Sequence, residues 1–86
     1  MNNKRILIIG GTGALGQALI RRYNEDNTIM IFSRDEHKHV DLTKKYIDVE
    51  SYLGDIRDKD SVRNCFDRFK PDVVINTAAI KHAPIC

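Results

Sequence analysis

Three glycines near the N-terminus place the strongest constraint on how this chain folds. Gly10, Gly13 and Gly16 directly follow a short apolar run at 5–9 and directly precede a stretch with helical periodicity. In a strand–turn–helix unit, the first glycine permits the sharp turn, the second lets a pyrophosphate approach the main chain, and the third lets the helix lie close to the sheet. The spacing therefore predicts a diphosphate-binding loop at the mouth of a helix, where N–H groups and the helix dipole favour an anion. A glycine-rich turn without a ligand is the alternative.

The rest of the chain alternates between apolar runs and amphipathic stretches, which is typical of an α/β fold. Strands are expected at 5–9, 29–32, 47–53 and 73–75, and helices at 15–23, 33–45 and 58–69. This alternation predicts a parallel sheet with right-handed crossovers, and hence the first half of a Rossmann-type doubly wound sheet in the order 3-2-1-4. In such a sheet the fourth strand is interior. We therefore expect residues 1–86 to be the N-terminal part of a dinucleotide-binding domain, with the remainder and the substrate-binding part in a longer chain.

Side-chain patterns make more specific predictions for individual elements. Ser33 and Glu36 have the spacing of a capping box, which predicts a helix that begins at Ser33. Ile47, Val49 and Leu53 share alternate positions with polar residues between them, as in an edge strand with one wetter face. The apolar stripe of the first helix is expected to comprise Leu15, Ala18, Leu19 and Tyr23, and that of the third helix Val62, Cys65, Phe66 and Phe69.

The residues that follow the second expected strand bear on which dinucleotide is bound. At this point of the fold, an acid binds the ribose 2′-hydroxyl of NAD, whereas an arginine accommodates the 2′-phosphate of NADP. Here the strand runs into Ser33 and Arg34, which can donate to a phosphate, and Asp35 is better placed at the helix N-terminus. The pattern favours NADP over NAD as the cofactor. A solvated surface charge is the alternative for Arg34.

A carboxylate follows the third expected strand. Asp55 and Ile56 lie at the edge of the sheet where the carboxyl ends of all the strands meet, and ligands bind at that edge of open α/β sheets. The Asp55 carboxylate can accept a hydrogen bond from the adenine amino group, and Ile56 offers an apolar surface and a main-chain donor. A turn or capping aspartate is the alternative.

Composition argues against several other functions. A net charge of +2, with acids interspersed among the Lys and Arg residues, provides no basic stripe for nucleic acid. No apolar run approaches the roughly 18 residues of a membrane span, and the run at 6–9 is shorter than a secretory apolar region of about 7–15 residues. Cys65 and Cys86 lack metal-ligand spacing, so no metal site is predicted and a reducing, cytoplasmic compartment is expected.

Four motifs together resemble one enzyme family. They are Gly-Gly-Thr-Gly-Ala-Leu-Gly at 10–16, Ser-Arg-Asp-Glu at 33–36, Gly-Asp-Ile-Arg-Asp at 54–58 and Ala-Ala-Ile-Lys-His-Ala-Pro at 78–84. The combination is similar to extended short-chain dehydrogenase/reductases, and within them to the polysaccharide-biosynthesis group typified by the inverting UDP-N-acetylglucosamine 4,6-dehydratases. The resemblance covers essentially the whole chain, which would be about the first quarter of a family member.

The resemblance implies a cofactor site and its residues. Thr12 to Leu15 would hold the pyrophosphate, Ser33 to Lys38 the phosphorylated ribose, and Asp55 and Ile56 the adenine. Thr77 and Lys81 would lie beside the nicotinamide-side ribose, with Lys81 also at the entry of the sugar nucleotide; a surface lysine is the alternative. The implied cofactor-binding set is Gly10, Thr12, Gly13, Ala14, Leu15, Gly16, Ser33, Arg34, Asp35, Glu36, Lys38, Asp55, Ile56, Thr77, Ala78 and Lys81.

The resemblance also implies a chemistry. NADP+ would take a hydride from C4 of a UDP-sugar, water would be eliminated across C5 and C6, and the hydride would return to C6. The family's Tyr-x-x-x-Lys pair is absent from this sequence, so no catalytic residue is assigned and the 86-residue chain by itself is expected to be inactive. A homo-oligomeric parent enzyme is expected. The alternatives are a sugar-nucleotide 4-epimerase, a 4-keto-sugar reductase or a catalytically dead dinucleotide-binding fragment.

Overall fold

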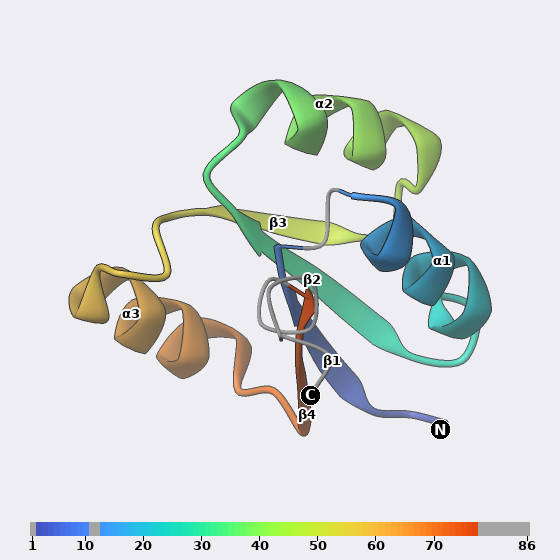
Figure 1. The fold of residues 1–86 in the computed structure, drawn as a ribbon. Coiled ribbons are helices and arrows are strands. Elements are labelled where there is room, and N and C mark those ends of the chain that lie inside the picture. The colour runs from blue at the N-terminus through green and yellow to red at the C-terminus, as the bar shows by residue number, and fades with distance from the viewer. Residues whose placement is uncertain (1, 11–12, 78–86) are drawn as a thin grey trace, which may run out of the picture.

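The chain folds into a four-stranded parallel sheet with helices on both faces (Figure 1). The computed structural model describes residues 2–10 and 13–77. The strands lie in the order β3-β2-β1-β4, as predicted. The elements are β1 (Arg5–Ile9), α1 (Ala14–Tyr23), β2 (Thr28–Ser33), α2 (Glu36–Lys45), β3 (Glu50–Leu53), α3 (Lys59–Phe69) and β4 (Val73–Asn76). No helix in the described ranges is long and apolar enough to cross a membrane.

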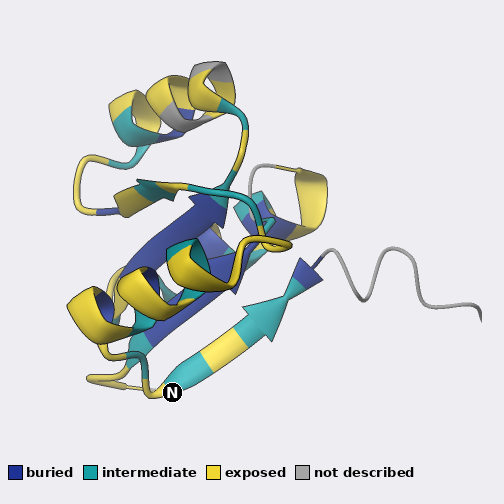
Figure 2. Cartoon of the chain, turned by 90° about the vertical axis from the view of Figure 1, so that its left-hand side faces the viewer, coloured by how far each residue is buried: buried dark blue, intermediate teal, exposed yellow. Residues whose placement is uncertain are grey.

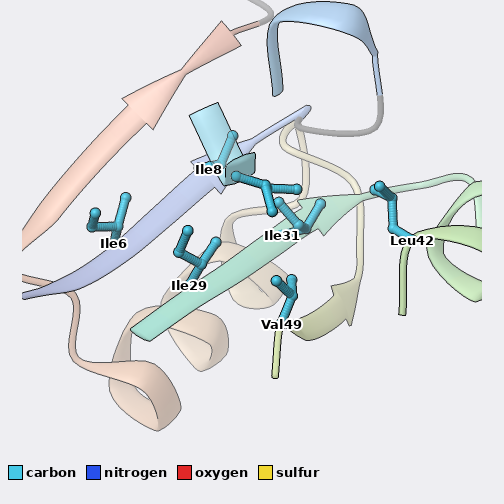
Figure 3. Close-up of a cluster of buried hydrophobic side chains, with 7 residues drawn as sticks. Ile6, Ile8, Ile29, Ile31, Leu42 and Val49 are labelled. Carbon is cyan, nitrogen blue, oxygen red and sulfur yellow. The ribbon is translucent and has the colours of Figure 1, made fainter. Parts of the chain in front are cut away.

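Alternate residues of the two central strands form two separate cores. On one face, side chains of β1 and β2 pack with Ile20 of α1 and Leu42 of α2 (Figure 3). On the other face, the alternate side chains of the same strands pack with Cys65 and Phe69 of α3. Strands β1 and β2 are therefore buried on both sides, whereas the edge strands β3 and β4 are only partly buried (Figure 2). Continuous apolar runs in β1 and β2 follow from this burial.

The strand register brings the carboxyl ends of the strands together. Ile9 at the end of β1 pairs with both Phe32 of β2 and Asn76 of β4. Beyond the ladder, the Gly10 N–H donates to the Phe32 carbonyl at 2.7 Å, and the Gly54 N–H donates to the Ser33 carbonyl at 3.0 Å. These hydrogen bonds fix the residues at which the chain leaves the sheet. The loops after β1, β2 and β3 therefore all start at the carboxyl ends of the strands.

The predicted start of the second helix is wrong by two residues. Ser33 remains in the sheet as the last paired residue of β2, opposite Leu53. The helix is capped instead by Asp35, whose side chain accepts the Lys38 N–H at 3.1 Å, and Glu36 is its first residue. Pairing with β3 keeps Ser33 in the ladder, so the helix does not start directly after it, and Asp35, the next residue able to cap, takes that position.

Two predicted apolar patterns are also corrected. The third strand begins at Glu50 rather than at 47, because residues 46–49 form a turn that leaves Ile47 85% exposed and buries Val49, with Tyr46 packed against the same core. In α1 the buried face consists of Gly16, Leu19, Ile20 and Tyr23, while Leu15 and Ala18 are exposed. The expected stripe omitted Gly16 and Ile20, although these positions have the spacing of one helix face. The stripe of α3 is confirmed.

Candidate functional site

An open groove of about 950 Å³ runs along the carboxyl ends of three strands. Its walls are residues 9–10 at the end of β1, residues 32–36 at the end of β2, and residues 54–57 after β3. The groove therefore brings together parts of three motifs that are far apart in the sequence. This is the edge at which open α/β sheets bind ligands.

The turn out of β1 depends on glycine. Gly10 adopts a φ of 74°, in the left-handed region that side chains with a Cβ disfavour. Its N–H still bonds to the Phe32 carbonyl, so the chain turns away immediately after the last ladder bond. The predicted role of the first glycine as the turn residue is consistent with this geometry. Thr12, in the same loop, lies outside the described residues.

The N-terminus of α1 differs from those of the other two helices. Helices α2 and α3 are capped by the carboxylates of Asp35 and Asp58, whereas the cap position of α1 is Gly13, which has no side chain to accept a hydrogen bond. The first turn of α1, which begins with Ala14, Leu15 and Gly16, also contains no acid. The first N–H groups of a helix have no intrahelical partner and carry partial positive charge. This helix end is the one that an external anion can cap.

No described residue fills the space in front of Gly13. The residue has φ −84° and ψ −173°, an extended conformation that any residue adopts, and a Cβ built on it meets none of the described atoms within 4 Å. Neither the backbone nor the packing of the described residues requires glycine at this position. A group that approaches the helix mouth from outside would require it.

The five residues expected at the ribose lie where β2 passes into α2. The Ser33 hydroxyl accepts the Asp35 N–H at 3.2 Å, and the Asp35 carboxylate is engaged as the cap of α2. Arg34 lies at the mouth of the groove with its side chain 69% exposed. Glu36 also lines the groove, whereas Lys38 is an exposed residue of α2 that does not.

Asp55 is held by arginine. Its Oδ2 accepts from Nη2 of Arg57 at 2.9 Å, and its Oδ1 accepts the main-chain N–H of Arg57 at 2.9 Å. The side-chain hydrogen bonds from Arg57, and next the main-chain bond, lower the pKa of Asp55 to about 2 from its usual value of 3.8. The carboxylate therefore stays ionised as pH falls until about 2, and at neutral pH it only accepts hydrogen bonds. Asp55 thus forms a turn, the alternative considered from the sequence, and also lines the groove beside Ile56.

Four residues that line the groove were not predicted as site residues: Ile9, Phe32, Gly54 and Arg57. Arg57 lines the groove through its contacts with Asp55, and Gly54 packs under the ring of Phe32. A Cβ at Gly54 would lie 2.9 Å from Cζ of Phe32 and 3.3 Å from Cβ of Ser61. The two-residue spacing between Asp55 and Arg57 is the signal in the sequence that could have indicated their pairing, because it permits an aspartate turn.

We expect Gly54→Ala to lower the free energy of unfolding by about 1–3 kcal/mol through overpacking. The Phe32 ring cannot easily move aside, since it is 3% exposed and stacked on Tyr52 with ring centroids 5.7 Å apart. Urea unfolding followed by circular dichroism would measure the change. Gly13→Ala is the comparison, because its added Cβ meets none of the described atoms within 4 Å, and only its weaker helix cap lowers the free energy of unfolding, by less than about 1 kcal/mol. Equal stability of the two variants would contradict the packing assigned to Gly54.

The fourth strand ends beside the first. Thr77 is buried, and its Oγ1 donates to the Ile9 carbonyl at 2.7 Å, which ties the carboxyl end of β4 to that of β1. Thr77 does not line the groove formed by the other three loops. The predicted residues Ala78 and Lys81, with the rest of the motif at 78–84, lie outside the described residues. Among the side chains that the structure describes, which do not include those of His37 and His39, no three His, Cys, Asp or Glu residues gather as a metal site.

Comparisons with known proteins agree with this architecture. The chain is 38% identical over 90 residues to the UDP-N-acetylglucosamine 4,6-dehydratase (inverting) of Campylobacter jejuni, covering 98% of this chain and 26% of that protein. It is 34% identical over 92 residues to the UDP-glucose 4-epimerase of Rickettsia typhi, again covering 98% and 26%. The chain thus spans about a quarter of the length of the curated relatives it matches.

A solved structure and a family model extend the comparison. The enzyme WbmG of Bordetella bronchiseptica, crystallised in complex with NAD, matches with a TM-score of 0.76 and 26% identity over 87% of this chain and 24% of that one. The family model described as polysaccharide biosynthesis protein matches residues 6–86. The resemblance drawn from the four motifs is therefore confirmed. The chain belongs to the polysaccharide biosynthesis protein family, whose fold here is that of the short-chain dehydrogenase/reductases.

Proposed function

We propose that this chain is the cofactor-binding segment of an NADP-dependent sugar-nucleotide 4,6-dehydratase, with UDP-N-acetylglucosamine as the substrate. The observation that carries the proposal is the mouth of α1, where a glycine cap and an acid-free first turn face open space. A pyrophosphate placed there would accept hydrogen bonds from the first N–H groups of the helix and lie at the positive end of its dipole. Gly10, Thr12, Gly13, Ala14, Leu15 and Gly16 make up this part of the site.

The adenosine end would occupy the groove. Ile56 is half exposed and would contact the adenine, and the ionised Asp55 would accept from its amino group. Ser33 and Arg34 would contact the ribose and its 2′-phosphate, with Glu36 and Lys38 nearby. Asp35 is engaged as a helix cap, so it is less available to bind the 2′-hydroxyl that would select NAD. These positions favour NADP.

The reaction itself is inferred from the relatives. When bound, a nicotinamide dinucleotide would supply reversible hydride transfer, from C4 and back to C6 of the sugar, with water lost across C5 and C6 between the two transfers. In this chain Thr77, Ala78 and Lys81 follow β4, and we place them at the nicotinamide-side ribose. Lys81 would also offset phosphate charge at the sugar-nucleotide entry, as a cation without proton transfer. We further propose that the parent enzyme is cytoplasmic and homo-oligomeric.

A 4-epimerase is the second candidate, because UDP-glucose 4-epimerases match the chain over the same length at 34% identity. The two activities differ in mass balance, since a dehydratase product has lost one water and an epimerase product has not. Mass spectrometry of UDP-N-acetylglucosamine incubated with the complete gene product would distinguish them.

Titration calorimetry with NADP+ and NAD+ tests the binding part of the proposal. We expect both dinucleotides to bind and NADP+ to bind more tightly. If neither produced heat with folded protein, the assignment of the glycine loop would be wrong. If NAD+ bound as tightly as NADP+, the assignment of the ribose contacts would be wrong, although the loop would stand.

A further inference from the structure

Two arginines from different strand ends share one carboxylate oxygen at the groove. Oδ2 of Asp55 lies 2.9 Å from Nη2 of Arg57 and 3.7 Å from Nη1 of Arg34. Arg34 follows β2 and Arg57 follows β3, and both line the groove. The two guanidinium groups therefore converge on a single point beside the position proposed for the phosphorylated ribose.

The Arg57 side chain is held in place although it is 77% exposed. Its Nε lies 3.2 Å from Oδ1 and 3.3 Å from Oδ2 of Asp55, in addition to the Nη2 and main-chain bonds. An exposed arginine ordinarily loses side-chain entropy when it binds a ligand, and part of that cost is already met here by the contacts with Asp55. The remaining edge of the guanidinium can donate to another anion, because the group carries five N–H donors.

The charges at this point favour a doubly charged ligand. Two guanidinium groups flank the one carboxylate of Asp55 at this point, although Asp35, engaged as the cap of α2, and Glu36 also line the groove. A phosphate monoester carries about −1.5 to −2 at neutral pH. A phosphate also presents three oxygens, so it can engage both arginines together, whereas a ribose hydroxyl presents one neutral oxygen. The arrangement therefore discriminates between the phosphorylated and the unphosphorylated ribose.

We propose that Arg57 is a second specificity-determining residue for the 2′-phosphate of the cofactor and binds it together with Arg34. This inference rests on the proposed binding of NADP. It adds a residue outside the set that the family motifs imply, and it assigns to the turn after β3 a part in cofactor selection as well as in adenine binding.

Fragments of the cofactor separate the contribution of the 2′-phosphate to binding from that of the adenosine. Titrations of the purified protein with 2′,5′-ADP and with 5′-AMP compare the same adenosine with and without the 2′-phosphate. We expect Arg57→Ala to weaken 2′,5′-ADP and NADP+ roughly tenfold, as for the loss of one charged contact. The affinities for 5′-AMP and NAD+ should change less than about twofold. Arg57→Lys should recover part of the loss, because it keeps the charge without the planar fork.

Arg63→Ala is the matched control. Arg63 is an exposed residue of α3 outside the groove, and its removal changes the net charge equally. We expect it to leave all four affinities unchanged. An equal loss of 2′,5′-ADP and 5′-AMP binding in Arg57→Ala would show that Arg57 only positions Asp55 for adenine, and would overturn the proposal. Unchanged affinities would overturn it too. Failure of the proposed function would appear separately, in the unsubstituted protein, as no binding of either dinucleotide or no preference for NADP+.

Discussion

A valine at position 13 is expected to abolish binding of both NADP+ and NAD+ while the protein remains folded. The Cβ and methyl groups of Gly13→Val would project into the open space before α1, where we place the pyrophosphate. Each hydrogen bond from an N–H group to a charged oxygen is worth about 1.5–3 kcal/mol, so loss of two such bonds weakens binding by roughly 100-fold or more. Because the pyrophosphate is common to both dinucleotides, both should be affected equally.

The substitution is informative because the fold should tolerate it. Gly13 has an extended conformation, and its added Cβ meets no atom within 4 Å. Valine is a poorer helix cap than glycine, which lowers the free energy of unfolding by about 1 kcal/mol. Thermal unfolding would verify that the variant folds, and calorimetry would measure its affinity for each dinucleotide.

Ala18→Val is the matched control for this variant. Ala18 is an exposed residue of the same helix, so Ala18→Val places the same side chain away from the helix mouth, at a helix-propensity cost of less than about 1 kcal/mol. We expect its dinucleotide affinities to match those of the unsubstituted protein. Retained affinity in a folded Gly13→Val protein would mean that the diphosphate lies elsewhere.

The sheet order was predictable because few topologies satisfy the sequence. Apolar runs at β1 and β2 require burial on both faces, and right-handed crossovers then leave the order observed. The ends of elements were less predictable, because they depend on partners. Ser33 and Asp35 are both good caps by type, and only the pairing of Ser33 with Leu53 decides between them.

The site was predictable to the extent that it is built from strand ends. Gly10, Arg34 and Asp55 each follow a predicted strand, so the topology alone brings them to one edge, where the groove lies. The role of Gly54 depends on the position of the Phe32 ring, and that of Arg57 depends on how its side chain folds back to Asp55. Neither contact could be predicted, because neighbouring residues in the sequence do not specify how these side chains pack in three dimensions.

Arg34→Ala is expected to erase most of the preference for NADP+ over NAD+. The Arg34 guanidinium lies 3.7 Å from Asp55, a separation longer than a hydrogen bond, so its donors can turn to a ligand phosphate. A charge-assisted contact of about 1.5–3 kcal/mol corresponds to a roughly 10- to 100-fold loss of NADP+ affinity. Affinity for NAD+, which lacks the phosphate, should change less than about twofold. Calorimetric titration of both dinucleotides gives the ratio directly.

Charge and geometry at Arg34 can be separated by a second substitution and by salt. Arg34→Lys keeps the positive charge but loses the bidentate fork, so we expect an intermediate preference for NADP+. Since the side chain is exposed, its contribution should also decline as ionic strength rises. A preference that stayed unchanged in Arg34→Ala would remove this residue from the ribose site. If Arg57→Ala then reduced the preference, the 2′-phosphate would be bound from the turn after β3 alone, and the motif at 33–36 would serve the start of α2 rather than the cofactor.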